Sequence, residues 1–368
     1  MNKKSEILPL TGLRFIAALF VFFFHIHIRW SLATNPFLKN ILDQGAIGMS
    51  VFFILSGFIL AYQYAGARTT QKSYLVNRFA RIYPIYAFTA IATLPWIGIT
   101  FVSTSNTDIA TGIGQGILLI FANIFIIQAW FPQFFSFWND GASWSISVEV
   151  FCYIILPFAS TLLEQLTIRQ LCAVAFICIL FSALPGLSAA LFPSPAVSIF
   201  YSLPIFRLPE FILGVCTCLA AKEGLGNRYG TFSQLVVLAV IFIYLGFAGP
   251  ALPIYVGHNW IVAPSIAFII LSLSNSRGFI SLILSSKPLL WLGKISYCIY
   301  SLQFLIIVPL IKHHDVIIEK FSLMQNNWIL AMTALFFLIL FSGIANYFIE
   351  EPSRIWIKRR YHQISSEK

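Results

Sequence analysis

Charged side chains are scarce in this sequence. Aspartate, glutamate, lysine and arginine together make up 10% of the residues, whereas hydrophobic types make up 59%. Soluble domains carry about 25% charged residues, so a soluble chain of this composition would leave a large apolar surface in contact with water. The shortage excludes an ordinary soluble globular protein and favours a chain embedded in a lipid bilayer.

The sequence also lacks the residue spacing of a metal site. Its 6 cysteines all lie within apolar segments, and none stands near paired histidines at the spacing that zinc requires. We therefore interpret them as small buried hydrophobic residues, and we expect no metal and no tightly bound cofactor. The cysteines are Cys152, Cys172, Cys178, Cys216, Cys218 and Cys298.

Long apolar runs fill most of the chain. Ten of them are long enough to cross about 30 Å of hydrocarbon. Backbone groups in lipid must pair within their own segment, so the predicted fold class is all-α, a polytopic transmembrane helix bundle. The runs are Leu10–Trp30, Ile47–Ala65, Tyr83–Phe101, Trp144–Leu163, Leu171–Leu191, Ile199–Ala221, Leu235–Gly249, Ile254–Leu273, Trp291–Ile311 and Trp328–Ile349.

The positions of lysine and arginine predict the topology. Lys3 and Lys4 place the N-terminus in the cytosol, and the basic residues 358–360 place the C-terminus there, because cytosolic loops are enriched in basic residues. Ten crossings satisfy both termini. A further apolar stretch, Gly112–Trp130, is therefore expected to be re-entrant or to lie against the outer side of the bundle.

The same rule explains the net charge of +10, so we expect no nucleic-acid partner. We expect a single integral-membrane domain over residues 1–368, with a core of 10–354 and a basic cytosolic tail of 355–368. Its localisation would be the inner, cytoplasmic membrane of a bacterium.

Arg14 and His25 are ionisable residues inside the first apolar run, where a charge is costly. They are eleven positions apart (25 − 14 = 11), which puts them on one helix face about 16 Å apart along the axis. A snorkelling arginine and a packed histidine would be the simpler interpretation. The shared face favours a functional one, with Arg14 holding an anion from the cytosol and His25 acting as a base deeper in the membrane.

Arg78 and Arg81 lie three apart in the cytosolic approach to the next helix. At this spacing both guanidinium groups can reach one side and bind phosphate oxygens. Topological anchoring by basic residues is the alternative, and the spacing alone does not exclude it.

Two further pairs share a helix face. Ser145 and Glu149 are four apart, near the outer surface by the predicted topology. The glutamate could orient a histidine or accept a hydrogen bond from a sugar hydroxyl; alternatively, the serine caps the helix and the glutamate lies in its first turn. Arg207 and Glu210 are three apart beside prolines, and we interpret them as a structural ion pair. Taken alone, these residues fit either a membrane transferase or a transporter with charges along its substrate path.

Several motifs, taken in order along the chain, resemble those of the membrane acyltransferase 3 family. They run from residue 10 to about 354, nearly the whole chain. They are Leu10-Thr11-Gly12-Leu13-Arg14 followed by His25, Phe52-Phe53-Ile54-Leu55-Ser56-Gly57-Phe58, Arg78-Phe79-Ala80-Arg81-Ile82-Tyr83-Pro84, Trp144-Ser145-Ile146-Ser147-Val148-Glu149, Leu292-Gly293-Lys294-Ile295-Ser296-Tyr297 and Glu351-Pro352-Ser353-Arg354.

The resemblance implies a function. Arg14, Arg78 and Arg81 would engage the phosphates of acyl-CoA, the donor substrate, with acetyl as the expected acyl group. His25 would be the essential base or would carry the acyl group, and Ser56, Ser145 and Glu149 would line the site.

The acceptor implied by the resemblance is a hydroxyl of a cell-surface or exported carbohydrate, such as an O-antigen or lipopolysaccharide sugar, free or lipid-linked. The chain departs from the family at Gln303, where a histidine is usual. Glutamine can form hydrogen bonds but cannot take a proton at neutral pH, so we interpret Gln303 as a substrate-positioning residue. A transporter or flippase of a lipid-linked sugar, without chemistry, is the alternative.

Overall fold

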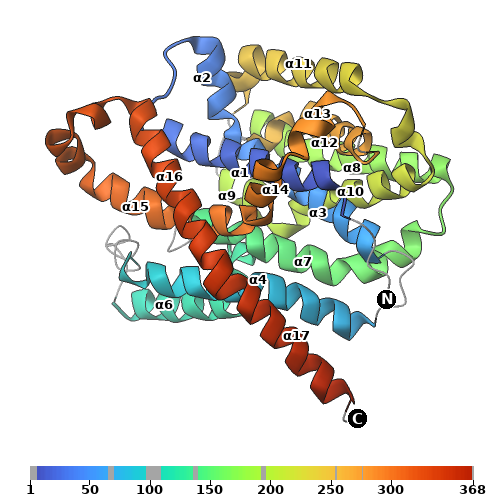
Figure 1. Cartoon of the computed structure of the whole chain (residues 1–368), viewed down its shortest axis with the longest axis horizontal. Coiled ribbons are helices and arrows are strands. Elements are labelled where there is room, and N and C mark those ends of the chain that lie inside the picture. The colour runs from blue at the N-terminus through green and yellow to red at the C-terminus, as the bar shows by residue number, and fades with distance from the viewer. Residues whose placement is uncertain are drawn as a thin grey trace.

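A computed structural model describes residues 6–64, 70–96, 109–135, 140–191, 196–252, 255–275 and 277–366. Within these ranges every regular element is helical, which confirms the predicted all-α bundle. Figure 1 shows most of the long helices running roughly side by side, with both ends of the chain at the same end of the bundle.

The helices have the following bounds. The α-helices are α1 (Leu8–His27), α2 (Pro36–Asp43), α3 (Gly48–Tyr64), α4 (Gln71–Thr93), α6 (Ile109–Ile124), α7 (Asp140–Leu163), α8 (Ile168–Leu191), α9 (Ala196–Ser202), α10 (Pro204–Lys222), α11 (Thr231–Ala248), α12 (Asn259–Leu273), α13 (Phe279–Leu284), α14 (Lys287–Lys294), α15 (Ser296–Lys320), α16 (Asn327–Ala345) and α17 (Glu351–Ser366). The short 3-10 turns are η1 (Gly45–Ile47), η2 (Leu94–Trp96), η3 (Gln128–Trp130), η4 (Pro132–Phe134), η5 (Leu225–Arg228), η6 (Gly249–Ala251), η7 (Tyr255–His258) and η8 (Ser322–Gln325), and η9 (Asn346–Glu350) is a π-helix.

Nine segments of the described chain are long and apolar enough to cross a membrane. They coincide with nine of the ten predicted runs, and this chain is accordingly a multi-pass membrane protein. The tenth run, Tyr83–Phe101, begins in α4, but its end lies outside the described residues.

The segment predicted to be re-entrant or to lie against the outer side of the bundle contributes to α6, which has 16 residues. At 1.5 Å per residue it is about 24 Å long, too short to cross the hydrocarbon. Its last turn reaches only the middle of α4, where the hydroxyl of Tyr86 donates to the carbonyl oxygen of Asn123 at 2.6 Å. Gln128, in η3, then donates to the carbonyl oxygen of Ser143 at 2.8 Å, so the start of α7 lies beside η3, whereas large side chains of α6 such as Ile113 and Ile117 are exposed. Whether the segment is re-entrant or lies against the outer side of the bundle stays a prediction.

Helices α3 and α10 form the closest contact in the core. A Cβ atom at Gly57 would stand 2.0 Å from the carbonyl oxygen of Phe211, and one at Gly214 would stand 1.9 Å from that of Ile54. Such reciprocal glycines let two backbones touch, as is common between membrane helices. Similarly, Gly293 abuts the carbonyl oxygen of Thr11, which places the end of α14, directly before α15, beside the start of α1.

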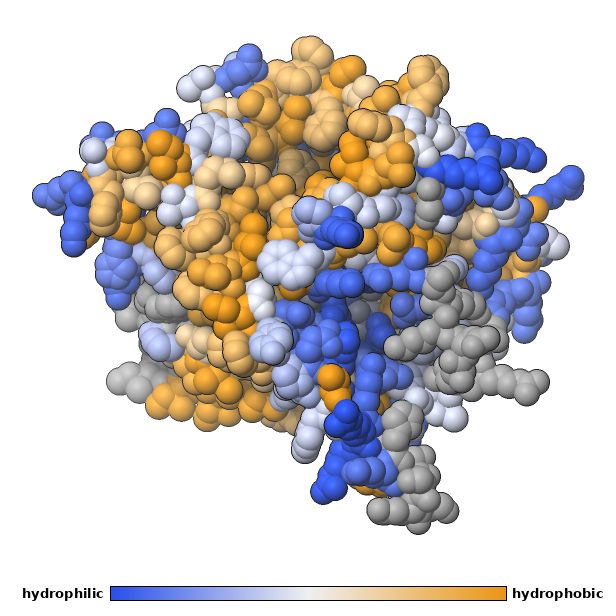
Figure 2. All heavy atoms as spheres, in the orientation of Figure 1, coloured by the Kyte–Doolittle hydropathy of each residue, from blue (hydrophilic) through white to orange (hydrophobic). Residues whose placement is uncertain are grey.

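The surface is largely apolar, as a lipid-facing surface should be. Large side chains such as Phe232 and Phe247 are 83% and 78% exposed, and Figure 2 shows orange surface over most of the visible face, with hydrophilic residues gathered around α17. Five of the cysteines are buried as predicted, but the prediction is wrong for Cys172, which is exposed. It lies one turn from exposed Phe176 on α8, so it shares the helix face that is turned outward.

Candidate active site

Five of the predicted site residues line one small cavity within the bundle. This inner cavity has a volume of about 90 Å³ and is walled mainly by α1, α3, α4, α7 and α15. The predicted residues in its wall are Arg14, Ser56, Arg81, Ser145 and Glu149. The first five motifs of the sequence therefore contribute residues to one cavity, although Arg14 and Tyr297 are 283 positions apart in the chain (297 − 14 = 283).

A second cavity lies next to it, at the end of the bundle where the chain begins and ends. This basic cavity has a volume of about 430 Å³ and is lined by Arg14, Arg78, Arg81, Lys294 and Arg354, together with Glu6, Thr11, Ile59, Gln63, Trp291, Ile295, Asn346 and Glu351. Arg14 and Arg81 line both cavities, so these two side chains stand at the boundary between them.

The positive charges of the basic cavity are only partly balanced. Arg354 pairs with Glu351 at 2.5 Å, and Arg81 pairs with Glu350. Among the described residues, Arg14, Arg78 and Lys294 have no ion-pair partner; Arg78 instead donates to the hydroxyl of Tyr64 at 3.3 Å. The cavity therefore carries an excess of positive charge and is suited to an anion.

Glu149 lies in the wall of the inner cavity. One of its oxygens accepts hydrogen bonds from Ser56 (3.2 Å) and from Tyr153. Its described contacts do not include His25, which the sequence had suggested it would orient. The carboxylate instead joins α7 to α3 and presents a negative charge opposite the arginines of the boundary.

The expected depth of Ser145 and Glu149 needs correction. The sequence placed them near the outer surface, but the hydroxyl oxygens of Ser145 and Tyr300 lie 2.7 Å apart. Tyr300 belongs to the second turn of α15, which starts beside the first turn of α1. The reason is that the 3-10 turn η3 packs against the start of α7, where Gln128 donates to the carbonyl oxygen of Ser143, so Ser145 is buried within the bundle and not at its surface.

His25 stands apart from the inner cavity. Its ring contacts those of Phe24 and Phe304, each with a centroid distance of 5.1 Å, and its Nδ1 is buried with no hydrogen-bond partner among the described residues. Phe304 follows Tyr300 by one turn on α15, so His25 lies about one helical turn beyond the end of the cavity. Gln303 is also buried, and its Nε2 likewise has no partner in the described chain.

The predicted structural ion pair is confirmed. Arg207 and Glu210 are both completely buried, their charged atoms lie 3.0 Å apart, and the Arg207 guanidinium sits over the ring of Phe53. Ser50 and Asn259 extend the pair with hydrogen bonds from α3 and α12. Neither charged residue lines the two cavities, so the pair serves the packing of α10.

Some residues of the site were missed from the sequence. Tyr153 and Tyr300 lie in apolar runs, where a tyrosine gives no distinct signal, and Glu350 directly precedes the motif that begins at Glu351 but was not assigned to it. Lys294 belonged to a recognised motif but had no assigned role. Within the described ranges, no group of three or more His, Cys, Asp or Glu side chains could hold a metal ion.

A family model and the known relatives of this chain all indicate an acyltransferase. A family model described as acyltransferase domain matches residues 8–347. Acyltransferase MdmB of Streptomyces mycarofaciens is 29% identical over 316 residues, which cover 81% of this chain and 78% of the relative.

Two longer relatives match as well. The "Putative peptidoglycan O-acetyltransferase YrhL" of Bacillus subtilis is 24% identical over 94% of this chain and 54% of its own length. O-acetyltransferase OatA of Staphylococcus aureus is 24% identical over 81% of this chain and 50% of its own length. The chain thus spans about half the length of these two relatives. No solved structure matches it significantly.

Proposed function

This chain belongs to the family of acyltransferase domains whose model it matches, and from that premise we propose that it is a membrane O-acyltransferase using acyl-CoA. The donor would enter the basic cavity from the cytosol, and the acyl group, expected to be acetyl, would pass to a hydroxyl of a carbohydrate. The donor, the acceptor and the sidedness are our proposals.

One observation carries the donor assignment. Arg14 lines both cavities and has no ion-pair partner among the described residues. An unpaired cation at the mouth of a membrane cavity costs free energy unless a bound anionic ligand pairs with it. Together with Arg78 and Lys294 it forms a site that suits the phosphates of a nucleotide-bearing donor.

The inner cavity suits the other part of such a donor. It is small, with Met49, Phe52, Phe53 and Leu55 in its wall. Beyond Arg14 and Arg81 at the boundary, its charged lining residue is Glu149, whose carboxylate would repel a phosphate that moved further in. A thin and uncharged chain, such as the pantetheine arm of coenzyme A, can enter where the phosphates cannot. The arrangement therefore fits a donor that is anionic at one end and neutral at the other.

His25 is the proposed base. It lies about 16 Å beyond Arg14 along α1, which is close to the length of an extended pantetheine arm. The imidazole would take the proton of the acceptor hydroxyl as the oxygen attacks the thioester carbonyl. The carbon–sulfur bond then breaks, and the thiolate leaves and takes up the proton as free coenzyme A. Gln303, on the neighbouring helix, would help to position the acceptor.

The acceptor class follows from the relatives. YrhL and OatA carry names that state O-acetyl transfer, and the first of these names peptidoglycan. A cell-surface or exported carbohydrate is therefore the proposed acceptor, with a lipid-linked O-antigen or lipopolysaccharide sugar as one candidate beside peptidoglycan.

A transfer assay tests the proposal. Purified protein in sealed vesicles would be given acetyl-CoA labelled in the acetyl group, with lipid-linked sugars or peptidoglycan fragments as acceptors. We expect label in the carbohydrate, released by mild base as an ester. Movement of the sugar across the vesicle without label transfer would overturn the proposal in favour of a transporter.

A further inference from the structure

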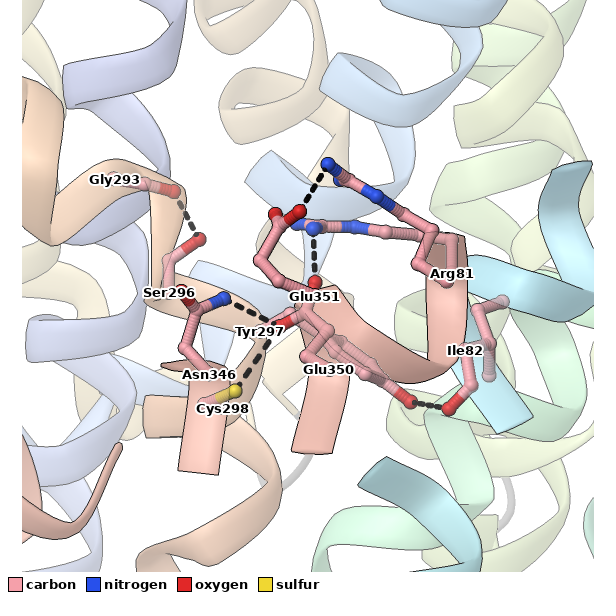
Figure 3. A network of polar contacts seen from close by, with 10 residues as sticks. Arg81, Ile82, Gly293, Ser296, Tyr297, Cys298, Asn346, Glu350 and Glu351 are labelled. Carbon is pink, nitrogen blue, oxygen red and sulfur yellow. Dashed lines mark hydrogen bonds and ion pairs between the residues drawn. The ribbon is translucent and has the colours of Figure 1, made fainter. Parts of the chain in front are cut away.

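Glu350 is a completely buried carboxylate that the proposed reaction does not use. It ends the π-helix η9, and its Oε1 pairs with the guanidinium of Arg81, 269 positions away in the chain. Its Oε2 accepts from the thiol of Cys298 at 3.1 Å and from Asn346 at 3.0 Å. Figure 3 shows these contacts converging on Glu350 from α4, from α15 and from the start of η9 itself, so both carboxylate oxygens are fixed.

Arg81 is in turn held from a second side. Its guanidinium lies 5.9 Å from the ring centre of Tyr297, and the hydroxyl of Tyr297 donates to the carbonyl oxygen of Ile82 at 2.8 Å. The Arg81 side chain is still 22% exposed, and it lines both cavities. Its position at the boundary is therefore set by buried partners, while part of the guanidinium remains open to a ligand.

The boundary separates two different environments. On one side the basic cavity attracts anions, and on the other the inner cavity is small and, beyond the two boundary arginines, has Glu149 as its charged lining residue. A guanidinium has five N–H donors, so one edge can bind Glu350 while another binds a phosphate oxygen. A phosphate stopped here would leave only the uncharged arm of the donor to continue inward.

We propose that Glu350 is a positioning residue: it fixes Arg81 at the boundary of the two cavities and thereby sets how deep a phosphate-bearing donor can enter. This rests on the proposed function, because it concerns the donor of that same site. A shift of about 1 Å in the reacting group can cost a hundredfold in rate, so fixing the phosphate would fix the thioester. The π-helical turn that carries Glu350 is a feature often found at functional sites.

The experiment compares two donors in variants of the full-length protein. Acetyl-CoA carries the phosphates, whereas acetyl-pantetheine has the same thioester and arm without them. In Glu350→Gln the carboxylate charge is lost at constant shape, and we expect the ratio of kcat/KM for acetyl-CoA over acetyl-pantetheine to fall about tenfold or more. In Glu350→Asp, which keeps the charge, the ratio should be partly restored.

Glu210→Gln provides a matched control. It makes the same substitution in an equally buried glutamate–arginine pair that lines neither cavity, so it should lower the rates with both donors alike and leave the ratio within about twofold. Arg81→Gln combined with Glu350→Gln removes both charges of the pair and avoids an uncompensated buried charge. If Glu350 acts through Arg81, the double variant should have the same donor ratio as the Arg81→Gln single variant.

The outcomes distinguish a failure of the inference about Glu350 from a failure of the proposed transferase function. If Glu350→Gln changes the rates with both donors by the same factor, Glu350 is structural and the inference fails while the transferase proposal stands. If the double variant has a lower ratio than Arg81→Gln alone, Glu350 does not act through Arg81, and the inference fails again. If the unmodified protein transfers acetyl from neither donor, it is the proposed function that fails.

Discussion

The hydroxyl oxygens of Ser145 and Tyr300 lie 2.7 Å apart and join α7 to α15 in the wall of the inner cavity. One turn further along α15, the ring of Phe304 packs against His25. This helix therefore links the cavity wall to the proposed base, and we expect a change at Tyr300 to alter the rate of acyl transfer.

Tyr300→Phe keeps the ring and removes the hydroxyl. We expect kcat to fall about five- to tenfold with little change in the donor KM, because a hydrogen bond of this kind is worth about 1 kcal/mol. Steady-state kinetics on the purified variant would measure it. Ser145→Ala should cause a similar loss, and the double variant should lose no more than either alone; independent losses that multiply would show that the two hydroxyls do not act together.

His25→Ala should abolish acyl transfer. The imidazole is buried between two aromatic rings and makes no side-chain hydrogen bond from Nδ1 to any described residue, so its removal should leave membrane insertion intact. The measurement is label transfer by protein that elutes as a single peak in detergent. Retained activity in such a preparation would remove His25 from the mechanism.

Arg78→Lys should raise the apparent KM for acetyl-CoA about tenfold and leave the KM for the acceptor unchanged. Lysine keeps the charge but loses the bidentate fork that binds phosphate. Arg228→Lys is the control, because it makes the same change at an exposed loop residue outside both cavities. Equal behaviour of the two variants would mean that Arg78 only anchors the topology.

Gly214→Ala should destabilise the bundle by about 1–3 kcal/mol, since the added methyl group would meet the backbone of α3. Thermal unfolding in detergent, followed by circular dichroism, would report a lower midpoint. Gly114→Ala is the matched control, because nothing lies within 4 Å of a Cβ at that position; it should be neutral or slightly stabilising. An unchanged midpoint for Gly214→Ala would show that α3 and α10 can separate freely.

The predicted sidedness can be tested directly. A reporter fused after Lys368 should read cytosolic, and one inserted in η8, between α15 and α16, should read external. Both readings follow from an even number of crossings with both ends inside. An external reading after Lys368 would overturn the topology and the proposed cytosolic entry of the donor.

Much of this architecture can be read from the sequence because lipid imposes a strict rule. Apolar runs must be helices, so nine of the spans could be located from the sequence, although some ends differ from the prediction: the span expected to begin at Ile47 begins at Pro36. Local spacing was informative for the same reason: Arg207 and Glu210 are neighbours on one helix, and their ion pair could be predicted without knowing the fold.

Contacts between helices that are distant in the sequence could not be predicted from apolar runs or local spacing. The pairing of Arg81 with Glu350 depends on how α4 and η9 meet, and no periodicity within either segment encodes it. The depth of Glu149 was misjudged for a related reason. Charge counting assigns the sides of loops, but it cannot show that α7 begins within the bundle, since the segment 131–143 contains no lysine or arginine.

The π-helix η9 has a consequence for how the chain can vary in length. A π-helical turn takes up about one residue more than an α-helical turn, so η9 offsets the rotation of α17 relative to α16. Deleting one residue there would turn all that follows by about 100° and carry Glu351 and Arg354 away from the basic cavity. Insertions and deletions should therefore be tolerated in the loop at η8 but should abolish function between residues 346 and 354. A scan of single-residue deletions, read out by acyl transfer, would test this.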